Sequence, residues 1–363
     1  MTGLAGLRIA LVGPLPPPAG GMAMQTRQLA ELLRNAKAEV TLVQSNAPYR
    51  PAFVGRLPGA RALFRLLPYL WALWRAAGRS DLLHVMANSG WSWHLFAAPA
   101  IWMAHARRVP VVVNYRGGEA ADFLRRSQGA VRLSMRRVAR LIVPSGFLQQ
   151  VFSAHGLAAE VVPNIVDLQR FHPAAARPTA PPQLLVARNL EAIYDNETAL
   201  RAFALVLQRH GRARLTVAGT GPLAAQLQGL AAALGIAAQV DFVGRVERDA
   251  MADLLRASTL AINPSRVDNT PNSVLEALAS GVPVVSTRVG GVPFIVEDGV
   301  TALLVPPQDP PAMAAALLRL LDDEALATRL AAAGLVQVQR YTWAQVAPRL
   351  TAVYREALAG TPA

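Results

Sequence analysis

The 363-residue chain contains no cysteine, and Lys37 is its only lysine. The lack of cysteine excludes disulfide bonds and thiolate metal sites, although it permits a reducing compartment. The chain also lacks an Asp-x-Asp triplet, and its six histidines are scattered. We therefore expect no catalytic metal ion and no cofactor. The first residues lack a charged segment followed by a long apolar core, so we expect no signal peptide.

Residues 82–106 contain no Asp, Glu, Lys or Arg and are the stretch that most resembles a membrane span. A spanning helix needs about 20 predominantly apolar residues in one run. Asn88, Gly90 and Pro99 interrupt this one, so we expect a short strand and an apolar helix buried in a soluble domain. The expected location is cytoplasmic, with peripheral contact to the inner face of the membrane left open.

Charge is distributed unevenly along the chain. Residues 1–172 hold 20 basic and 7 acidic residues, whereas the remainder holds 16 of each, so the net charge of +13 comes from the first half. An arginine-rich genome explains the choice of arginine but not its confinement to one half. A basic surface attracts phosphates of lipids, substrates or nucleic acid.

Short apolar runs rich in β-branched residues alternate with helical patterns in both halves. This alternation predicts two parallel sheets with crossover helices. The expected strands are 7–12, 40–43, 82–85, 109–113, 141–144 and 160–162, then 183–187, 214–218, 240–243, 260–262, 282–286 and 302–305. A Pro- and Ala-rich linker follows Phe171. We expect domains at 1–172 and 173–340, with a final helix at 341–363 that packs back on the first. Ligands of such sheets bind beyond the carboxyl ends of the strands, here in the cleft between the domains.

Two glycine-containing turns are candidate phosphate sites. Gly20 and Gly21 follow the first strand and precede a helix, where backbone amides can approach an anion closely. Gly219 and Gly221 follow a strand of the second half in the same way. An ordinary strand-to-helix turn explains either pattern equally well.

Arg188 follows the first strand of the second half. An arginine at this position can bind a diphosphate in bidentate fashion, or it can be a solvated loop residue.

The segment 263–285 carries the most specific pattern. A loop with Asp268 precedes a helix for which Thr270 is the expected cap and Pro271 the expected first residue. Glu276 lies inside this helix among leucines, and a buried carboxylate needs partners. Those partners are sugar or ribose hydroxyls, or else a nearby arginine on a solvated face.

In order, these segments resemble the retaining glycosyltransferases of family 4 over nearly the whole chain. Two further segments, 161–171 and 289–299, and the closing Tyr341-Thr342-Trp343 belong to the resemblance. It implies the α/β GT-B fold, in which two Rossmann-like domains face a central cleft. It also implies a metal-independent, hexosyltransferase-like enzyme of polysaccharide biosynthesis. Such an enzyme moves a sugar from a nucleotide-diphosphate sugar to a glycan or lipid-linked acceptor with retention of configuration.

The resemblance assigns roles at matching positions. Asp268 would contact donor-sugar hydroxyls, Glu276 the nucleotide ribose and Arg188 the diphosphate, with Gly20 and Gly21 near the reacting phosphates. The remaining expected donor contacts are Gly219, Gly221, Asn269, Thr270 and Asn272.

Three departures from the family pattern bear on activity. The lysine that usually follows the arginine is missing after Arg188. Arg116 stands where a histidine often follows the fourth strand, and we count it among the catalytic candidates. Pro271 replaces a residue with a backbone N–H, so one donor contact is lost. A GT-B-type sugar-nucleotide epimerase and a degenerate sugar-nucleotide-binding protein without turnover therefore remain alternatives. We do not expect nucleic acid to be a partner.

The stretch from Arg50 to Arg79 intersperses arginines with aromatic and leucine side chains. Within it, residues 61–77 predict an amphipathic helix that Pro68 bends or splits. Such a helix suits an anionic membrane surface, and a second basic run at 125–140 adds to this reading. The alternative is a surface helix whose apolar side packs on the sheet.

Overall fold

The computed structural model describes residues 3–17, 20–48, 60–175 and 181–360. The chain forms two compact units, which are described separately. Unit 1 comprises residues 1–165 and 343–363, and unit 2 comprises residues 166–342.

Unit 1 is built on a six-stranded parallel sheet in the order β2-β1-β3-β4-β5-β6. Its central strands are buried along nearly their whole length, which explains their continuous apolar sequences. The strands are β1 (Arg8–Gly13), β2 (Glu39–Gln44), β3 (Leu82–Ala87), β4 (Val111–Tyr115), β5 (Arg140–Val143) and β6 (Glu160–Val161). The helices are α1 (Gly21–Asn35), α2 (Ala60–Ala77), α3 (Ala98–Ala106), α4 (Ala120–Met135), α5 (Gly146–Ala154) and α12 (Trp343–Ala359).

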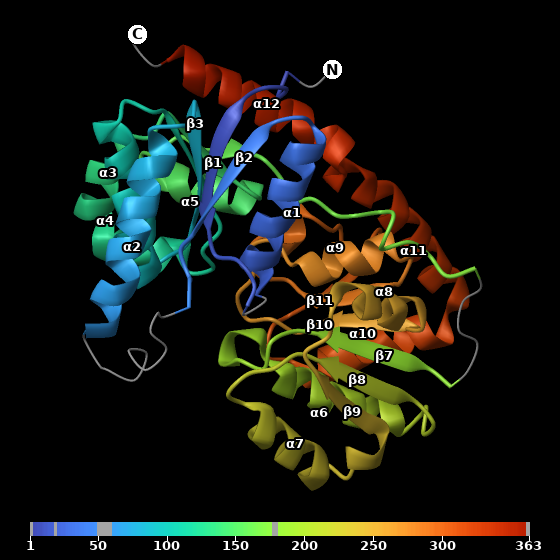
Figure 1. The fold of residues 1–363 in the computed structure, drawn as a ribbon. Helices are drawn as coiled ribbons and strands as arrows, with labels where there is room; N and C mark the ends of the chain where they lie inside the picture. The colour runs from blue at the N-terminus through green and yellow to red at the C-terminus, as the bar shows by residue number, and fades with distance from the viewer. Residues whose placement is uncertain (1–2, 18–19, 49–59, 176–180, 361–363) are drawn as a thin grey trace. The chain divides into compact units, whose positions relative to one another are not determined.

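Alternate residues of β1 point into two separate cores on the two faces of this sheet. Ala10 and Val12 pack with α2, α3 and α5, whereas Ile9 and Leu11 pack with α1 and α12 (Figure 1). The final helix of the chain therefore completes the core of unit 1.

Unit 2 contains a second six-stranded parallel sheet, in the order β12-β11-β10-β7-β8-β9. Its strands are β7 (Gln183–Ala187), β8 (Arg214–Ala218), β9 (Val240–Gly244), β10 (Leu260–Asn263), β11 (Val284–Thr287) and β12 (Leu303–Val305). One face is covered by α6 (Asn196–Leu207), α7 (Ala224–Ala233) and α10 (Pro310–Asp322). The other face carries α8 (Arg248–Arg256) and α9 (Asn272–Ala279), and α11 (Glu324–Val338) packs against α9.

The boundary between the units lies between Ile165 and Val166, seven residues before the expected one. Val166 and Phe171 cause this difference, because both side chains belong to the core of unit 2 and Phe171 is fully buried. The segment that resembles the start of a linker in sequence is thus part of the second unit.

Strand order determines where each sheet is expected to bind ligands. In unit 2 the connections reverse direction between the neighbouring strands β7 and β10, and in unit 1 they do so between β1 and β3. Ligands of open parallel sheets bind at the carboxyl ends of strands at such a reversal. These two points position the candidate residues below.

The charge-free run forms β3, a π-helical turn (Trp93–Ala97) and α3. Within the described residues, no helix combines the length and the hydropathy that crossing a bilayer requires. Helix α2 continues through Pro68, so this residue does not split it.

Candidate functional site

Arg188 lies just past β7, at the reversal point of the unit 2 sheet. Its Nε donates a 2.7 Å hydrogen bond to Asn263 Oδ1, and its guanidinium forms an ion pair with Asp268. The Arg188 and Asp268 side chains are only 11% and 10% exposed. Burial lowers the pKa of Arg188 to about 10, so the guanidinium still carries its charge at neutral pH.

Asn263, the last residue of β10, holds Arg188 through a defined amide orientation. Its Oδ1 accepts from Arg188 Nε and from Ser265 Oγ at 2.9 Å, while its Nδ2 donates to Ser286 Oγ at 2.9 Å. Because Arg188 Nε is only a donor, the amide oxygen must face it. Asn263 is a site residue that the sequence did not reveal, and its position at a strand's carboxyl end is the signal that points to it.

The loop with Asp268 is fixed through its backbone. Gly291 N donates to the Asp268 carbonyl at 2.9 Å, and a Cβ on Gly290 would lie 2.1 Å from that same oxygen. Gly290 also has a φ of +49°, which disfavours other residues. Glycine is therefore required at position 290 to place Asp268, whereas residue 291 contributes its backbone N–H.

Glu276 lies on α9, and its environment is electrostatically unusual. Burial raises the pKa of its carboxyl to about 7, although Arg248, Arg188 and Arg170 act in the opposite direction. Among the described residues, none donates a hydrogen bond to this carboxylate or forms an ion pair with it within 4.0 Å. Glu276 therefore differs from the arginine-paired surface glutamate that was the alternative expectation.

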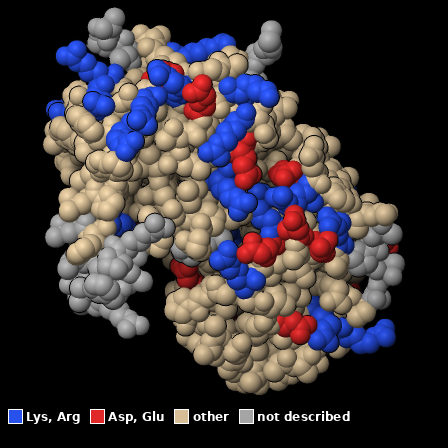
Figure 2. Space-filling model, viewed as in Figure 1, with Lys and Arg blue, Asp and Glu red and all other residues tan. Residues whose placement is uncertain are grey.

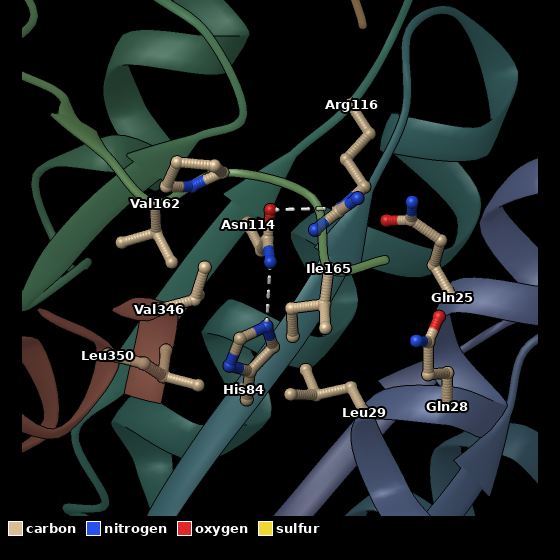
Figure 3. A pocket seen from close by; sticks show the side chains of 11 residues that line it. Gln25, Gln28, Leu29, His84, Asn114, Arg116, Val162, Ile165, Val346 and Leu350 are labelled. Atoms are coloured by element: carbon tan, nitrogen blue, oxygen red, sulfur yellow. Dashed lines mark hydrogen bonds between the residues drawn. The ribbon is translucent and has the colours of Figure 1, made fainter. Parts of the chain in front are cut away.

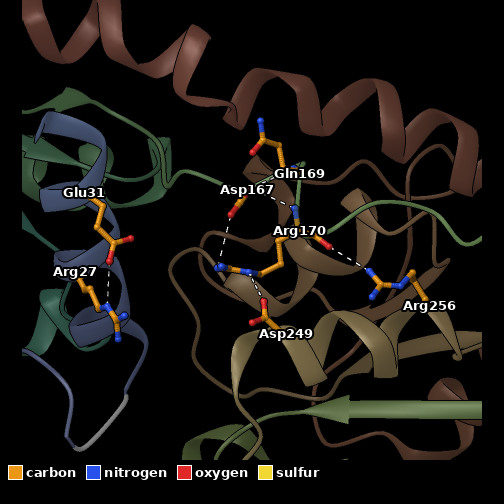
Figure 4. Close-up of polar contacts among 7 residues, drawn as sticks. All are labelled: Arg27, Glu31, Asp167, Gln169, Arg170, Asp249 and Arg256. Carbon is orange, nitrogen blue, oxygen red and sulfur yellow. Dashed lines mark hydrogen bonds and ion pairs between the residues drawn. The ribbon is translucent and has the colours of Figure 1, made fainter. Parts of the chain in front are cut away.

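Arg248 and Arg170 are site residues that the sequence alone did not identify. Arg248 begins α8, after the carboxyl end of β9, and its guanidinium lies 5.8 Å from the centre of the Phe171 ring. Arg170 donates to Asp249 at 2.7 Å and forms an ion pair with Asp167, while its carbonyl accepts from Arg256 (Figure 4). The position of Arg248 after a strand is the same signal that identified Arg188.

The start of α9 differs from the expectation. The helix begins at Asn272 with Pro271 as an extended N-cap, and no side chain caps it. Thr270 donates its hydroxyl to the Asn269 carbonyl at 2.7 Å, so the assignment of Thr270 as the cap was wrong. The extended ψ of 113° at Pro271 moves the helix start by one residue.

Gly219 and Gly221 follow β8 and pack against the backbone that carries Arg188. A Cβ on Gly219 would lie 2.0 Å from the Arg188 carbonyl oxygen, and one on Gly221 would lie 2.3 Å from that of Leu190. These glycines are thus needed for loop packing. Their contact with a donor stays a prediction.

In unit 1, the expected glycine turn precedes α1. Gly20 is the N-cap of a helix that begins at Gly21, no side chain caps it, and its first turn contains no acidic residue. Among the described residues other than its chain neighbours, none has an atom within 4 Å of the position where a Gly20 Cβ would stand. Such an uncapped helix start favours an anion.

Arg116 lies beyond β4 in unit 1, beside a small pocket (Figure 3). The pocket is lined by Gln25, Gln28, Leu29, His84, Asn114, Arg116, Val162, Pro163, Ile165, Val346 and Leu350. Arg116 Nε donates to Asn114 Oδ1 at 3.1 Å, and its Nη1 donates to Asn164 Oδ1 at 2.5 Å. Burial lowers the pKa of Arg116 to about 9, which leaves it charged at neutral pH.

The polar chain continues from Arg116 into the core. Asn114 Nδ2 lies 3.1 Å from His84 Nε2, and His84 Nδ1 lies 2.8 Å from the hydroxyl of Tyr354 on α12. Since Asn114 Oδ1 faces Arg116, its Nδ2 donates to His84 Nε2, and His84 must carry its proton on Nδ1. Burial, aided by Arg116, lowers the pKa of His84 to about 3, so this histidine is neutral. We call Arg116, Asn114, His84 and Tyr354 the Arg116 relay.

The four catalytic candidates thus fall into two groups. Arg188, Asp268 and Glu276 belong to unit 2, where Arg188 and Asp268 touch and Arg188 influences the carboxyl of Glu276. Arg116 belongs to unit 1 and is held by its relay. Within the described ranges, no group of three or more His, Asp or Glu side chains is arranged to hold a metal ion.

Family comparisons match both units. Residues 181–323 match the family described as Glycosyl transferases group 1, and residues 19–170 match Glycosyltransferase Family 4. A D-inositol 3-phosphate glycosyltransferase of Thermobispora bispora is 30% identical over 77% of this chain and 72% of that protein. A phosphatidyl-myo-inositol mannosyltransferase of Mycobacterium tuberculosis is 28% identical over 98% of both chains.

Other relatives are matched over a shorter part. D-inositol 3-phosphate glycosyltransferase 1 of Catenulispora acidiphila is 34% identical over 58% of this chain, and the match covers 55% of that protein. The chain thus spans about half the length of this and several similar relatives.

Solved structures share the fold. Sucrose-phosphate synthase from Thermosynechococcus elongatus aligns with a TM-score of 0.77 at 22% identity, over 97% of this chain and 99% of that one. Anabaena HepE in complex with UDP aligns with a TM-score of 0.74 at 17% identity, over 96% of this chain and 100% of that one. The two parallel sheets agree with the fold of these structures, and each unit matches a family description. Together with the relative from Thermobispora bispora, these matches show that the chain belongs to the group 1 glycosyltransferases of family 4, with the GT-B fold.

Proposed function

We propose that this protein transfers a sugar from a nucleotide-diphosphate sugar to an acceptor hydroxyl, with retention of anomeric configuration. The observation that carries the proposal is the grouping of Arg188, Asp268 and Glu276 at the reversal point of the unit 2 sheet. This grouping supports the proposal because open parallel sheets bind nucleotides at the carboxyl ends of the strands at such a reversal.

Each of these residues has a distinct task in the proposal. The Arg188 guanidinium, oriented by Asn263, binds the donor diphosphate. Ribose hydroxyls donate to Glu276, whose carboxylate has no hydrogen bond from the described residues. Because those bonds stabilise the charged form, donor binding lowers the pKa of Glu276. Asp268 holds Arg188 and accepts from hydroxyls of the donor sugar.

The transfer itself exchanges one bond to the anomeric carbon for another. The bond to the leaving phosphate oxygen breaks, the acceptor oxygen attacks the same face, and its proton passes to the leaving diphosphate. No cofactor or metal takes part in the proposed step. Arg188 and backbone amides at uncapped helix starts stabilise the charge that develops on the diphosphate. A catalytic role of Arg116 in unit 1 is also part of this proposal.

The acceptor is proposed to be a glycan or a lipid-linked polyol. Relatives whose names contain inositol phosphate and phosphatidyl-myo-inositol support a phosphorylated polyol as the first compound to test. The basic character of the first half of the chain agrees with an acceptor that carries phosphate.

One observation favours a second function, donor binding without turnover. Arg188 is already paired with Asp268, and the lysine that usually follows this arginine is missing. The positive charge available to a diphosphate is therefore smaller than in the family pattern.

The test begins with a panel of nucleotide sugars screened for thermal stabilisation, because a bound ligand shifts stability by mass action. The donor that binds is then incubated with inositol phosphates, phosphatidylinositol and glycan acceptors, and products are analysed by mass spectrometry and NMR. An α-linked product from an α-linked donor supports the proposal. Binding without a product in any acceptor mixture supports the second function, and a donor epimer formed without acceptor identifies an epimerase. A panel with no binding at all contradicts both sugar-nucleotide functions.

A further inference from the structure

Helix α2 carries an apolar stripe on its outward side. Phe64, Leu67, Trp71 and Trp74 are 48%, 63%, 61% and 41% exposed. Their spacing of three, four and three residues places them on one face of the helix. An outward helix face is normally polar, and a contiguous exposed apolar surface marks an interaction site.

The stripe is not needed to hold the helix in place. The opposite side of α2 supplies Tyr69, Leu73, Ala76 and Ala77 to the core of unit 1, and Tyr69 donates its hydroxyl to the Phe96 carbonyl at 2.7 Å. The sequence suggested either a helix that packs on the sheet or one that suits a membrane surface, and α2 has a side of each kind. One side packs on the sheet, and the other side is apolar and exposed.

Arginines lie over the tryptophans of this surface. Arg75 lies 4.5 Å from the centre of the Trp71 ring, and Arg107 lies 4.3 Å from that of Trp74. Trp102 lies on the neighbouring α3, and Arg137, just after α4, lies 3.7 Å from the centre of its ring. Trp102 is 37% exposed, and its indole N–H donates to Ser134. Each stack holds a cation beside an exposed indole.

The surrounding surface is strongly basic. Residues 64–140 contain only three acidic residues, of which Asp81 and Asp122 form ion pairs with Arg8 and Arg125. The exposed arginines of this range are Arg75, Arg79, Arg107, Arg108, Arg125, Arg126, Arg132 and Arg136. Basic side chains gather along the upper edge of unit 1 in Figure 2. An apolar stripe within a basic surface is complementary to a ligand that is both apolar and anionic.

We propose that the aromatic-arginine face docks on the interface of an anionic lipid bilayer. This face consists of Phe64, Leu67, Trp71, Trp74, Trp102, Arg75, Arg107 and Arg137. Indoles settle at the headgroup level, guanidinium groups bind lipid phosphates, and phenylalanine and leucine enter the acyl boundary. Two other partners fit this face less well. The phosphates of a polynucleotide would pair with the arginines but leave Phe64 and Leu67 exposed to water, and a second copy of the chain would bring two basic surfaces together.

The main experiment measures partitioning of the full chain onto vesicles. Vesicles of phosphatidylcholine alone are compared with vesicles that also contain phosphatidylglycerol, at low and high salt. We expect binding to the anionic vesicles that weakens as salt rises. The double variant Leu67→Gln/Trp71→Gln lowers the partition coefficient about tenfold or more. The matched control is Val336→Gln, which changes a 74% exposed apolar residue of unit 2 and leaves binding unchanged.

The arginines are tested separately. Arg75→Gln and Arg107→Gln each lower partitioning to anionic vesicles about fivefold, with little effect on phosphatidylcholine alone. The control is Arg329→Gln, at an exposed arginine of unit 2. Lipids brominated on the acyl chain add a measure of depth: they quench tryptophan fluorescence of the wild type, and Trp71→Phe loses part of this quenching.

Three results would overturn the proposal. The first is that the protein does not bind anionic vesicles at low salt, and the second is that wild type and the Leu67→Gln/Trp71→Gln variant bind them equally. The third is that the protein self-associates without lipid and this variant does not, which would assign the face to a second copy. Unfolding curves that match the wild type show that the variants are folded. Because the assay contains no sugar donor, its outcome is independent of the proposed transfer reaction.

Discussion

Replacing Glu276 by Gln is expected to stabilise the free protein and to weaken donor binding. Burial raises the pKa of this carboxyl from 4.5 to about 7. Between these values the folded state holds a proton that the unfolded state has released, so the stabilising effect of the protonated form is lost as pH rises. A neutral glutamine does not titrate. The difference in the free energy of unfolding between variant and wild type should therefore be small near pH 4.5 and grow to about 3 kcal/mol above pH 7.

The same substitution should cost donor affinity. Glutamine retains an acceptor for ribose hydroxyls but lacks the charge, and a charge-assisted hydrogen bond contributes about 1.5–3 kcal/mol. The dissociation constant for the donor should rise about 10- to 150-fold. Glu276→Gln should therefore raise stability and lower donor affinity, as expected when a buried carboxylate serves binding at a cost in stability.

The assay can follow the two units separately. All six tryptophans lie in unit 1, so fluorescence in urea reports that unit, whereas hydrogen exchange of peptides from residues 166–342 reports unit 2. Calorimetry gives donor affinity. The control Glu31→Gln alters an exposed glutamate that pairs with Arg27 in unit 1 and should change stability by less than about 0.5 kcal/mol at any pH. A stability difference for Glu276→Gln that does not vary between pH 4.5 and 8 would refute the electrostatic reasoning, and unchanged donor affinity would refute the assignment to ribose.

Three further outcomes are expected. Arg188→Ala should lower kcat more than the same change at the exposed Arg329, because it removes charge stabilisation of the leaving diphosphate; turnover within twofold of wild type would show that another residue fills this role. Activity should survive EDTA, and complete loss that Mg²⁺ or Mn²⁺ restores would contradict a metal-free mechanism. Asn114→Leu should destabilise unit 1 by about 2 kcal/mol, because Arg116 loses the acceptor for its Nε and His84 loses its donor. Tryptophan fluorescence in urea measures this change, and an unaltered midpoint would show that the Arg116 relay contributes nothing to stability.

Much of the fold was predictable because buried parallel strands have continuous apolar sequences. The bounds of β7 and β8 coincide with the expected ones, and the other strands differ by one or two residues at one or both ends. The unit boundary was missed because Phe171 lies two residues before Pro173, at the start of a segment that resembles a linker. Its burial depends on tertiary packing with residues far along the chain.

The site was predictable only in part. Arg188, Asp268 and Glu276 were named from their positions after strands and on a helix. The ion pair between Arg188 and Asp268, and the raised pKa of Glu276, depend on how separate strands meet and on how deeply the carboxyl is buried. Likewise, Arg116 was named, but its link to Tyr354 through Asn114 and His84 joins residues that local sequence patterns cannot relate.

The placement of α12 has a consequence for the order in which the chain folds. During synthesis from the amino terminus, unit 2 is a continuous segment and has all its residues before α12 exists. Until α12 has emerged, β3, β4 and β5 lack the helix that packs on this face of the sheet, and His84 lacks its partner Tyr354. Unit 1 is therefore the first to begin synthesis and the last to complete its fold, and the part of its sheet that α12 covers is open to chaperones or to aggregation for most of translation.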